Sequence, residues 1–214
     1  MQNNPLRRLL ARLRPRQVPV KELGERDRRR VLRHFLALED SDRLLRFGAR
    51  LKDEQVEAYV RKIDFARDIV FGVLNRRFQL VGVGHLAFHH KHGHREQVTT
   101  KDRVAEFGVS VSASARGKGV GSALFERAAI HCRNSDIDTL YMQCLSSNRT
   151  MMHIAKKAGM EIKREYGEAD AYLHLPPPSP GSVLQEAFHE QFALIDYAVK
   201  ANARAAIKWL KPKK

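Results

Sequence analysis

The stretch Ala105-Glu-Phe-Gly-Val-Ser-Val-Ser-Ala-Ser-Ala-Arg-Gly-Lys-Gly-Val-Gly-Ser-Ala-Leu-Phe-Glu-Arg127 is the most informative part of this sequence. Its first part, from residue 104 to residue 111, is rich in valine and alternates between two faces, which predicts a β-strand. The closely spaced glycines that follow predict a tight turn, because glycine adopts backbone conformations that other residues avoid. From residue 120 the apolar side chains recur at helical spacing up to residue 132. The predicted order is therefore strand, glycine-rich turn and helix.

The glycine-rich turn, Arg116-Gly-Lys-Gly-Val-Gly121, is a candidate site for a pyrophosphate. Free backbone N–H groups at the start of a helix point at such a turn, and glycine lets a ligand approach the backbone closely. Arg116 and Lys118 add positive charge. Two common phosphate-binding motifs are excluded: the Walker loop lacks its Gly-Lys-Ser/Thr, and the dinucleotide fingerprint would need a glycine at position 122. A purely structural turn is the alternative interpretation.

On both sides of this segment, the residue patterns predict a chain in which strands and helices are mixed. Residues 68–75 and 78–88 read as an antiparallel hairpin with its turn at residues 75–77. Residues 41–48 are predicted to form a loop. Extended segments or strands are further expected at residues 17–22, 104–111, 139–145, 161–166 and 171–175. Helices are expected at residues 24–38, 52–62, 120–132, 148–158 and 182–210.

The two ends differ in composition from the middle. Residues 1–16 interleave arginines with leucines and form a basic N-terminal extension, which could touch RNA or a membrane surface. Residues 176–180, Pro-Pro-Pro-Ser-Pro, read as a linker. We therefore divide the chain into the extension at 1–16, a domain at 17–176, and a Pro-rich linker with a helical tail at 177–214. The tail carries an apolar stripe that could dock on its own domain or on a second subunit.

Composition sets limits on the function. The chain has 214 residues, 43% of them apolar, and a formal net charge of +15, which favours an anionic partner. That partner could be a phosphate-rich cofactor, nucleic acid or a ribosomal surface; a solvated basic surface is the alternative. No secretory signal or membrane span is apparent, and two cysteines are too few for a disulfide framework, so a cytoplasmic location is expected. Histidines cluster at residues 89–94 without partner cysteines, and we expect no metal there.

Residues 105–127 resemble the central motif of the GNAT acetyltransferase family. In that family an Arg/Gln-x-x-Gly-x-Gly/Ala turn joins the fourth strand to a helix, and the matching residues here are Arg116, Gly119 and Gly121. Residues 148–160 are similar to the family's Asn-x-x-Ala-x-x-Leu-Tyr-x-x-x-Gly-Phe segment. The resemblance spans about residues 18–176 and is strongest from 104 to 175. It implies an α/β GNAT acyl-CoA fold, a mixed sheet of six to seven strands flanked by helices, here with a C-terminal helical extension.

The resemblance also implies acetyl-CoA as cosubstrate. Family members hold the coenzyme A pyrophosphate at the turn and admit the pantetheine arm into a splay between the fourth and fifth strands. The positions that match this role are Val109, Ser110, Val111, Arg116, Gly117, Lys118, Gly119, Val120, Gly121, Ser122 and Asn148.

Glu106 is the candidate general base. Strand alternation places Glu106, Gly108 and Ser110 on one face of the predicted strand, where a carboxylate could take a proton from an ammonium substrate. A surface or ion-paired glutamate is the alternative. The tyrosine that often serves as general acid in the family is replaced by Ala155. Another tyrosine (141, 166 or 172) could substitute, or no acid is needed, because a coenzyme A thiolate leaves readily.

Two functions follow from this interpretation. The first is transfer of an acetyl group from acetyl-CoA to an amine by direct attack in a ternary complex. The acceptor could be a protein lysine, a protein N-terminus or a small amine. The second is a non-catalytic module that senses acyl-CoA and binds nucleic acid or a ribosomal partner through its basic ends. Either function is compatible with a homodimer.

Overall fold

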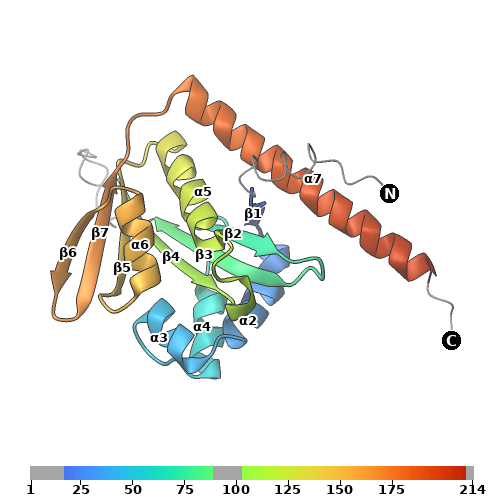
Figure 1. Ribbon diagram of the computed structural model, residues 1–214, viewed down its shortest axis with the longest axis horizontal. Coiled ribbons are helices and arrows are strands. Elements are labelled where there is room, and N and C mark those ends of the chain that lie inside the picture. Colours follow the sequence, from blue (N-terminus) through green and yellow to red (C-terminus); the bar gives the residue numbers. More distant parts are fainter. Residues whose placement is uncertain (1–16, 89–102, 211–214) are drawn as a thin grey trace, which may run out of the picture.

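The computed structural model describes residues 17–88 and 103–210. A mixed seven-stranded sheet with the order β1-β2-β3-β4-β5-β7-β6 forms the centre of the molecule, and helices cover both of its faces (Figure 1). Neighbouring strands are antiparallel except for β4 and β5, which are parallel. The mixed sheet predicted from the sequence is therefore confirmed.

The strands are β1 (Lys21–Leu23), β2 (Ile69–Leu74), β3 (Leu80–Phe88), β4 (Val104–Val111), β5 (Thr139–Leu145), β6 (Glu161–Glu165) and β7 (Glu168–His174). The helices are α2 (Arg28–Leu36), α3 (Asp40–Phe47), α4 (Asp53–Lys62), α5 (Val120–Asn134), α6 (Arg149–Lys157) and α7 (Pro180–Leu210). Short 3-10 turns precede α2 (Glu25–Asp27) and α5 (Ala113–Ala115). The hairpin, the glycine turn between strand and helix, and the predicted helices are all present, with small differences in their ends.

The loop predicted at residues 41–48 is wrong, because the chain forms helix α3 there. Gly48 ends this helix in the left-handed conformation, with φ of 71°. The buried side chain of Arg43 donates hydrogen bonds to the carbonyls of Leu36, Leu38 and Leu51. These contacts reach residues outside the helix. A local pattern could not reveal them, and they hold the segment against its neighbours.

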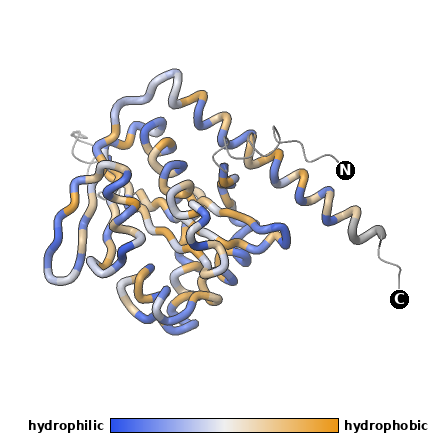
Figure 2. Tube along the Cα trace, viewed as in Figure 1, coloured by the Kyte–Doolittle hydropathy of each residue, from blue (hydrophilic) through white to orange (hydrophobic). Residues whose placement is uncertain are grey.

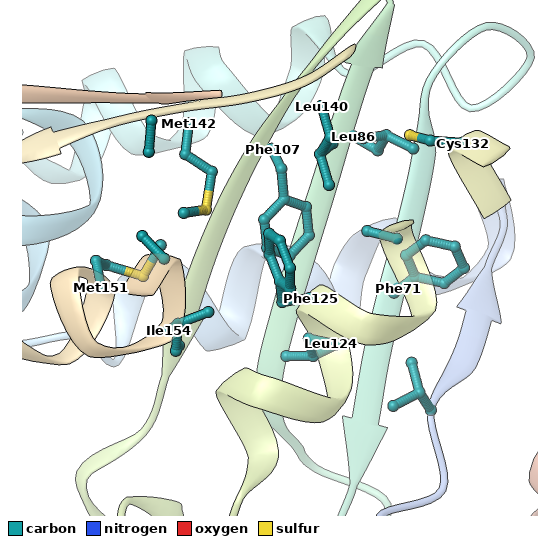
Figure 3. Close-up of a cluster of buried hydrophobic side chains, with 14 of the residues drawn as sticks. Phe71, Leu86, Phe107, Leu124, Phe125, Cys132, Leu140, Met142, Met151 and Ile154 are labelled. Atoms are coloured by element: carbon teal, nitrogen blue, oxygen red, sulfur yellow. The ribbon is translucent and has the colours of Figure 1, made fainter. Parts of the chain in front are cut away.

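Each face of the sheet has its own apolar core. On one face, Phe107 of β4 meets Phe125 of α5 with ring centroids 5.8 Å apart, and Leu124 lies beside them (Figure 3). On the other face, α2 and α4 pack their buried Val31, Phe35 and other apolar residues against Val83 of β3. The residues of β4 alternate between these two environments, as predicted from the sequence, so Gly108 and Ser110 face α3 and α2.

Helix α7 runs past α5 and along the β1–β2 end of the sheet (Figure 1). Near its start, Glu186 accepts hydrogen bonds from Arg127 and His131 of α5. Farther along, the ammonium of Lys200 donates to the carbonyl of Leu74 at 2.9 Å. Apolar and polar residues alternate along the helix (Figure 2), and its outer face exposes several large apolar side chains. The C-terminal helical extension is therefore confirmed. Within residues 17–88 and 103–210, no helix is long and apolar enough to cross a membrane.

Candidate active site

The two parallel strands at the centre of the sheet separate soon after they begin. Strand β4 pairs with β5 at Val104, Ala105 and Glu106, and no pairing between them continues beyond Glu106. The β5-facing edge of β4 therefore carries backbone N–H and C=O groups that the sheet ladder leaves free. The splay predicted between these strands is present in the structure.

A cavity of about 440 Å³ lies beside this splay. It is bounded by the end of β4, the glycine turn, the first residues of α5, the start of α6 and one side of α3. The lining residues predicted from the sequence are Val109, Ser110, Val111, Arg116, Gly117, Gly119, Val120, Gly121, Ser122 and Asn148. Positions far apart in the chain thus meet at a single hollow, which has room for part of an extended ligand.

The glycine turn has the backbone that its sequence predicts. Gly117 and Gly119 have φ of 69° and 77°, a conformation that favours glycine. Gly119 is also the N-cap of α5, so the first N–H groups of this helix open toward the cavity. Helix N-termini with accessible N–H groups attract anions through these donors and through the helix dipole.

Lys118 is placed differently from its neighbours. Its ammonium donates a hydrogen bond of 2.6 Å to the carbonyl of Ser114, and the residue does not line the cavity. The positive charge of the turn therefore reaches the cavity through Arg116. Its guanidinium forms an ion pair with the carboxylate of Asp42 on α3.

Asn148 and Ser110 have structural partners at the cavity wall. The Asn148 side chain accepts a hydrogen bond from the backbone N–H of Met151 and caps α6. The hydroxyl of Ser110 lies 2.8 Å from Nε2 of His34, and Nδ1 of His34 lies 3.1 Å from the carbonyl of Leu80. Because that carbonyl can only accept, Nδ1 carries the proton and Ser110 donates to Nε2. Burial lowers the pKa of His34 to about 4, so the ring is neutral near pH 7.

Glu106 lies at the last paired position of β4, beside the cavity but not in its lining. It is half-buried and opposite Tyr141 of β5 in register. The hydroxyl of Tyr141 donates a 2.7 Å hydrogen bond to Asp170. Burial raises the pKa of Tyr141, and the Asp170 bond and the charge of Glu106 raise it further.

The other two candidate tyrosines also lie outside the cavity lining. The ring of Tyr172 packs against that of Tyr141 at 5.1 Å, whereas Tyr166 is 98% exposed. Burial raises the pKa of Cys132 to about 12 and also raises that of Cys144, so both thiols are protonated near pH 7.

The side of the cavity formed by α3 was missed from the sequence. Leu38, Asp42, Leu45 and Arg46 line it, and all but the first belong to the helix that we predicted to be a loop. Their spacing becomes informative once the segment is known to be a helix, because Asp42, Leu45 and Arg46 then share one face. The basic extension at 1–16 and the histidines at 89–94 lie outside the described residues. Within the described part, no group of three or more His, Cys, Asp or Glu residues could hold a metal ion.

The mixed sheet, its central splay and the helix that starts at this splay are the fold features that the sequence resemblance implied. Residues 34–160 match the sequence profile described as the Acetyltransferase (GNAT) family. This chain belongs to that family, which uses acetyl-CoA as cosubstrate, so the resemblance found in the sequence is confirmed. No curated protein sequence matches the chain.

Solved structures show the same fold at low sequence identity. The GNAT domain of S. lividans PAT has a TM-score of 0.60 and 22% identity, with 73% of this chain and 89% of that domain covered. A phosphinothricin acetyltransferase from Sinorhizobium meliloti, solved with AcCoA, has a TM-score of 0.55 and 14% identity over 77% and 95% of the two chains. A ribosomal-protein-alanine N-acetyltransferase from Brucella melitensis has a TM-score of 0.53 and 16% identity, covering 73% and 99%.

Proposed function

We propose that this protein transfers an acetyl group from acetyl-CoA to an amine acceptor by direct attack in a ternary complex. The observation that carries the proposal is the convergence of the glycine turn, the start of α5 and the free edge of β4 on one cavity. Each part suits a different portion of the cosubstrate. The acceptor is a protein lysine, a protein N-terminus or a small amine.

The cosubstrate would bind along the splay. Backbone N–H groups of residues 117–122 and the guanidinium of Arg116 would hold the diphosphate, with Lys118 adding charge from the outside. The free backbone edge at Val109, Ser110 and Val111 would pair with the amides of the pantetheine arm. Asn148 would act indirectly: its side chain caps α6, and the start of this helix forms the opposite wall of the cavity. In this proposed order the thioester would lie toward Gly108 and Glu106, where β4 and β5 begin to separate.

Glu106 is the proposed general base. It would take a proton from the acceptor ammonium, directly or through water, so that the neutral nitrogen attacks the thioester carbon. The new C–N bond forms, the C–S bond breaks and the electron pair leaves on the sulfur of coenzyme A, while the second proton of the nitrogen passes to this thiolate, directly or through water. A thiol pKa of about 8.5 makes this thiolate a tolerable leaving group, so the mechanism does not depend on a tyrosine acid.

A thiol-release assay with acetyl-CoA and a panel of amines and peptides tests the proposal. We expect turnover with at least one class of acceptor and a fall of about 10²–10⁴-fold in Glu106→Gln, the range expected for loss of a positioned base. The affinity for coenzyme A, measured by calorimetry, should stay within a few-fold. Glu57→Gln, an exposed carboxylate on α4, is the matched control.

Two other results would decide against the catalytic proposal. Unchanged turnover in Glu106→Gln would remove this residue as the base. Coenzyme A binding without turnover on any acceptor would favour the acyl-CoA-sensing module, and salt-sensitive RNA binding would then support its basic ends as a nucleic-acid site.

We also propose that the chain is divided into a basic extension (1–16), an acetyltransferase domain (17–176) and a linker with a helical tail (177–214). It also includes a homodimer, for which the exposed apolar face of α7 is the support. A cytoplasmic location stays a prediction from the sequence.

A further inference from the structure

Arg46 lines the cavity, and its guanidinium lies close to β4 at Gly108. A Cβ atom at position 108 would lie 2.6 Å from both Cζ and Nη2 of Arg46 and 2.7 Å from its Nη1. Any larger residue at this position would therefore push the guanidinium away. The glycine in the middle of the strand makes room for a cation.

Three aromatic rings also lie close to this guanidinium. Its Cζ lies 5.0 Å from the ring centroid of Phe47, 5.5 Å from that of Tyr59 and 5.8 Å from that of Phe35. Such contacts stabilise a cation but do not cancel its charge. Arg43, Arg116 and Arg127 each pair with a carboxylate, whereas Arg46 forms no ion pair with any described residue.

The hydrogen bonds of Arg46 are also incomplete. Its Nε is buried and has no hydrogen-bond partner among the described residues. A buried polar group left unsatisfied costs about 1–3 kcal/mol. The fold therefore holds a positive charge beside the cavity at a cost in stability.

A chain of three side chains orients this charge. Nη2 of Arg46 donates to the hydroxyl of Tyr59 at 2.8 Å, and that hydroxyl lies 2.8 Å from Nδ1 of His85. Nε2 of His85 lies 3.1 Å from Oδ2 of Asp68. A guanidinium can only donate, so the hydroxyl of Tyr59 must donate a hydrogen bond to Nδ1, and His85 then donates from Nε2 to Asp68. Burial, followed by the charge of Arg46, lowers the pKa of His85, which fits the neutral ring that this order of donors requires.

We propose that Arg46 is a catalytic cation that stabilises the negative charge on the thioester oxygen during acetyl transfer, and that Tyr59, His85 and Asp68 are its positioning residues. This inference rests on the proposed function. Gly108 lies between Glu106 and Ser110 on the same face of β4, so a thioester delivered to Glu106 would pass the guanidinium. When the amine nitrogen attacks, the C=O π pair moves onto the oxygen. Collapse re-forms the C=O bond and expels the sulfur as a thiolate, which takes the second proton from the nitrogen, directly or through water, while Glu106 holds the first.

Variants of Arg46 test the proposal by kinetics and by the carbonyl stretch of bound acetyl-CoA labelled with ¹³C at the acyl carbon. We expect Arg46→Met to lower kcat by about 10²–10³-fold, the usual loss for one oxyanion donor, while coenzyme A affinity stays within threefold. In Arg46→Met, the carbonyl band of bound acetyl-CoA should move from its frequency in the wild type toward the frequency of acetyl-CoA in water. Arg46→Lys should restore part of both effects, and Tyr59→Phe should show an intermediate loss. Arg50→Met removes an exposed arginine four residues further along the chain and is the control.

Gly108→Ala provides a second test that changes no charge. The added methyl group should displace the guanidinium and lower kcat nearly as much as Arg46→Met. In the Arg46→Met background the same methyl group enters vacated space and should have little further effect. This strong non-additivity is expected only if the glycine acts through Arg46. Additive losses would overturn the proposal.

The outcomes separate this inference from the proposed function. If the wild-type protein neither binds coenzyme A nor transfers acetyl groups, the proposed function fails. If the wild type is active and Arg46→Met keeps kcat within threefold and an unchanged carbonyl band, the role of Arg46 alone is overturned. Should Arg46→Met fail to fold, Arg46→Lys, Tyr59→Phe and Gly108→Ala still decide the question.

Discussion

The carboxylate of Asp42 on α3 forms an ion pair with the guanidinium of Arg116 in the glycine turn. Both residues line the cavity, and the Asp42 side chain is only 13% exposed. The arginine proposed to bind the diphosphate is thus already paired with an anion of the protein. A bound cosubstrate would have to share Arg116 with this carboxylate or displace it.

Asp42→Asn should therefore tighten coenzyme A binding. The substitution removes a negative charge that both repels the diphosphate and competes for Arg116. We expect Kd to fall about tenfold, equivalent to about 1.4 kcal/mol, when it is measured by calorimetry at low salt. The gain should shrink at high salt because the interaction is screened. Asp40→Asn, on the exposed start of the same helix, is the control; weaker binding in Asp42→Asn would mean that Asp42 orients Arg116 for the ligand.

Gly119→Ala should weaken coenzyme A binding at least tenfold. Gly119 has φ of 77°, a conformation in which any residue with a side chain is strained. No protein atom lies within 4 Å of the added methyl group, but the diphosphate of the ligand would approach there. Gly159→Ala is a matched control, because Gly159 has φ of 72° and equal free space but lies outside the cavity. Both variants should lose about 1 kcal/mol of stability from backbone strain. Equal coenzyme A affinity in the two variants would contradict the placement of the diphosphate.

Glu186→Gln should loosen the contact between α7 and α5. Burial alone would raise the pKa of Glu186, but hydrogen bonds from His131, Arg127 and Asn134 lower it to about 2. A carboxyl group with a lowered pKa stabilises the fold above its unfolded pKa and loses that contribution as the pH falls toward its folded pKa. We expect a loss of about 2 kcal/mol near pH 7, discounted for the partly exposed carboxylate.

Urea unfolding between pH 7 and pH 3 measures this effect. The wild type should lose stability below about pH 4.5, whereas Glu186→Gln should show a flatter profile over the same range. Glu190→Gln removes an exposed carboxylate from the same helix and should behave like the wild type. Parallel profiles for wild type and Glu186→Gln would show that the ion pair between Glu186 and Arg127 contributes no net stability.

Phe188→Glu should dissociate the proposed homodimer. Leu184, Phe188, Ile195 and Val199 are each at least 59% exposed on α7. They are separated by four, seven and four residues, a symmetric pattern. Such a pattern suits pairing with α7 of a second copy of the chain in the antiparallel direction. Sedimentation analysis should show a dimer for the wild type and a monomer for Phe188→Glu. Gln185→Glu adds the same charge beside the stripe as a control, and a monomeric wild type would refute the dimer.

The sequence alone predicted the part of the site that is continuous in the chain. The strands at residues 104–111 and 139–145 have the predicted bounds, because the run of β-branched and apolar residues that predicts a strand is a local property of the sequence. The turn at Gly117 and Gly119 was predictable for the same reason: its unusual backbone requires glycine, and the residues that need it are adjacent. The family resemblance followed from this one segment and its order relative to residues 148–160.

Helix α3 and the surroundings of Arg46 depend on contacts between residues far apart in the chain. Helix α3 depends on carbonyls outside its own turns that accept hydrogen bonds from Arg43, so its eight residues gave no sufficient local signal. The chain from Arg46 through Tyr59 and His85 to Asp68 joins residues from four separate segments, and no spacing in the sequence relates them. Local conformation follows from neighbours along the chain, whereas a buried charge and its orientation depend on which side chains the folded sheet and helices bring into contact.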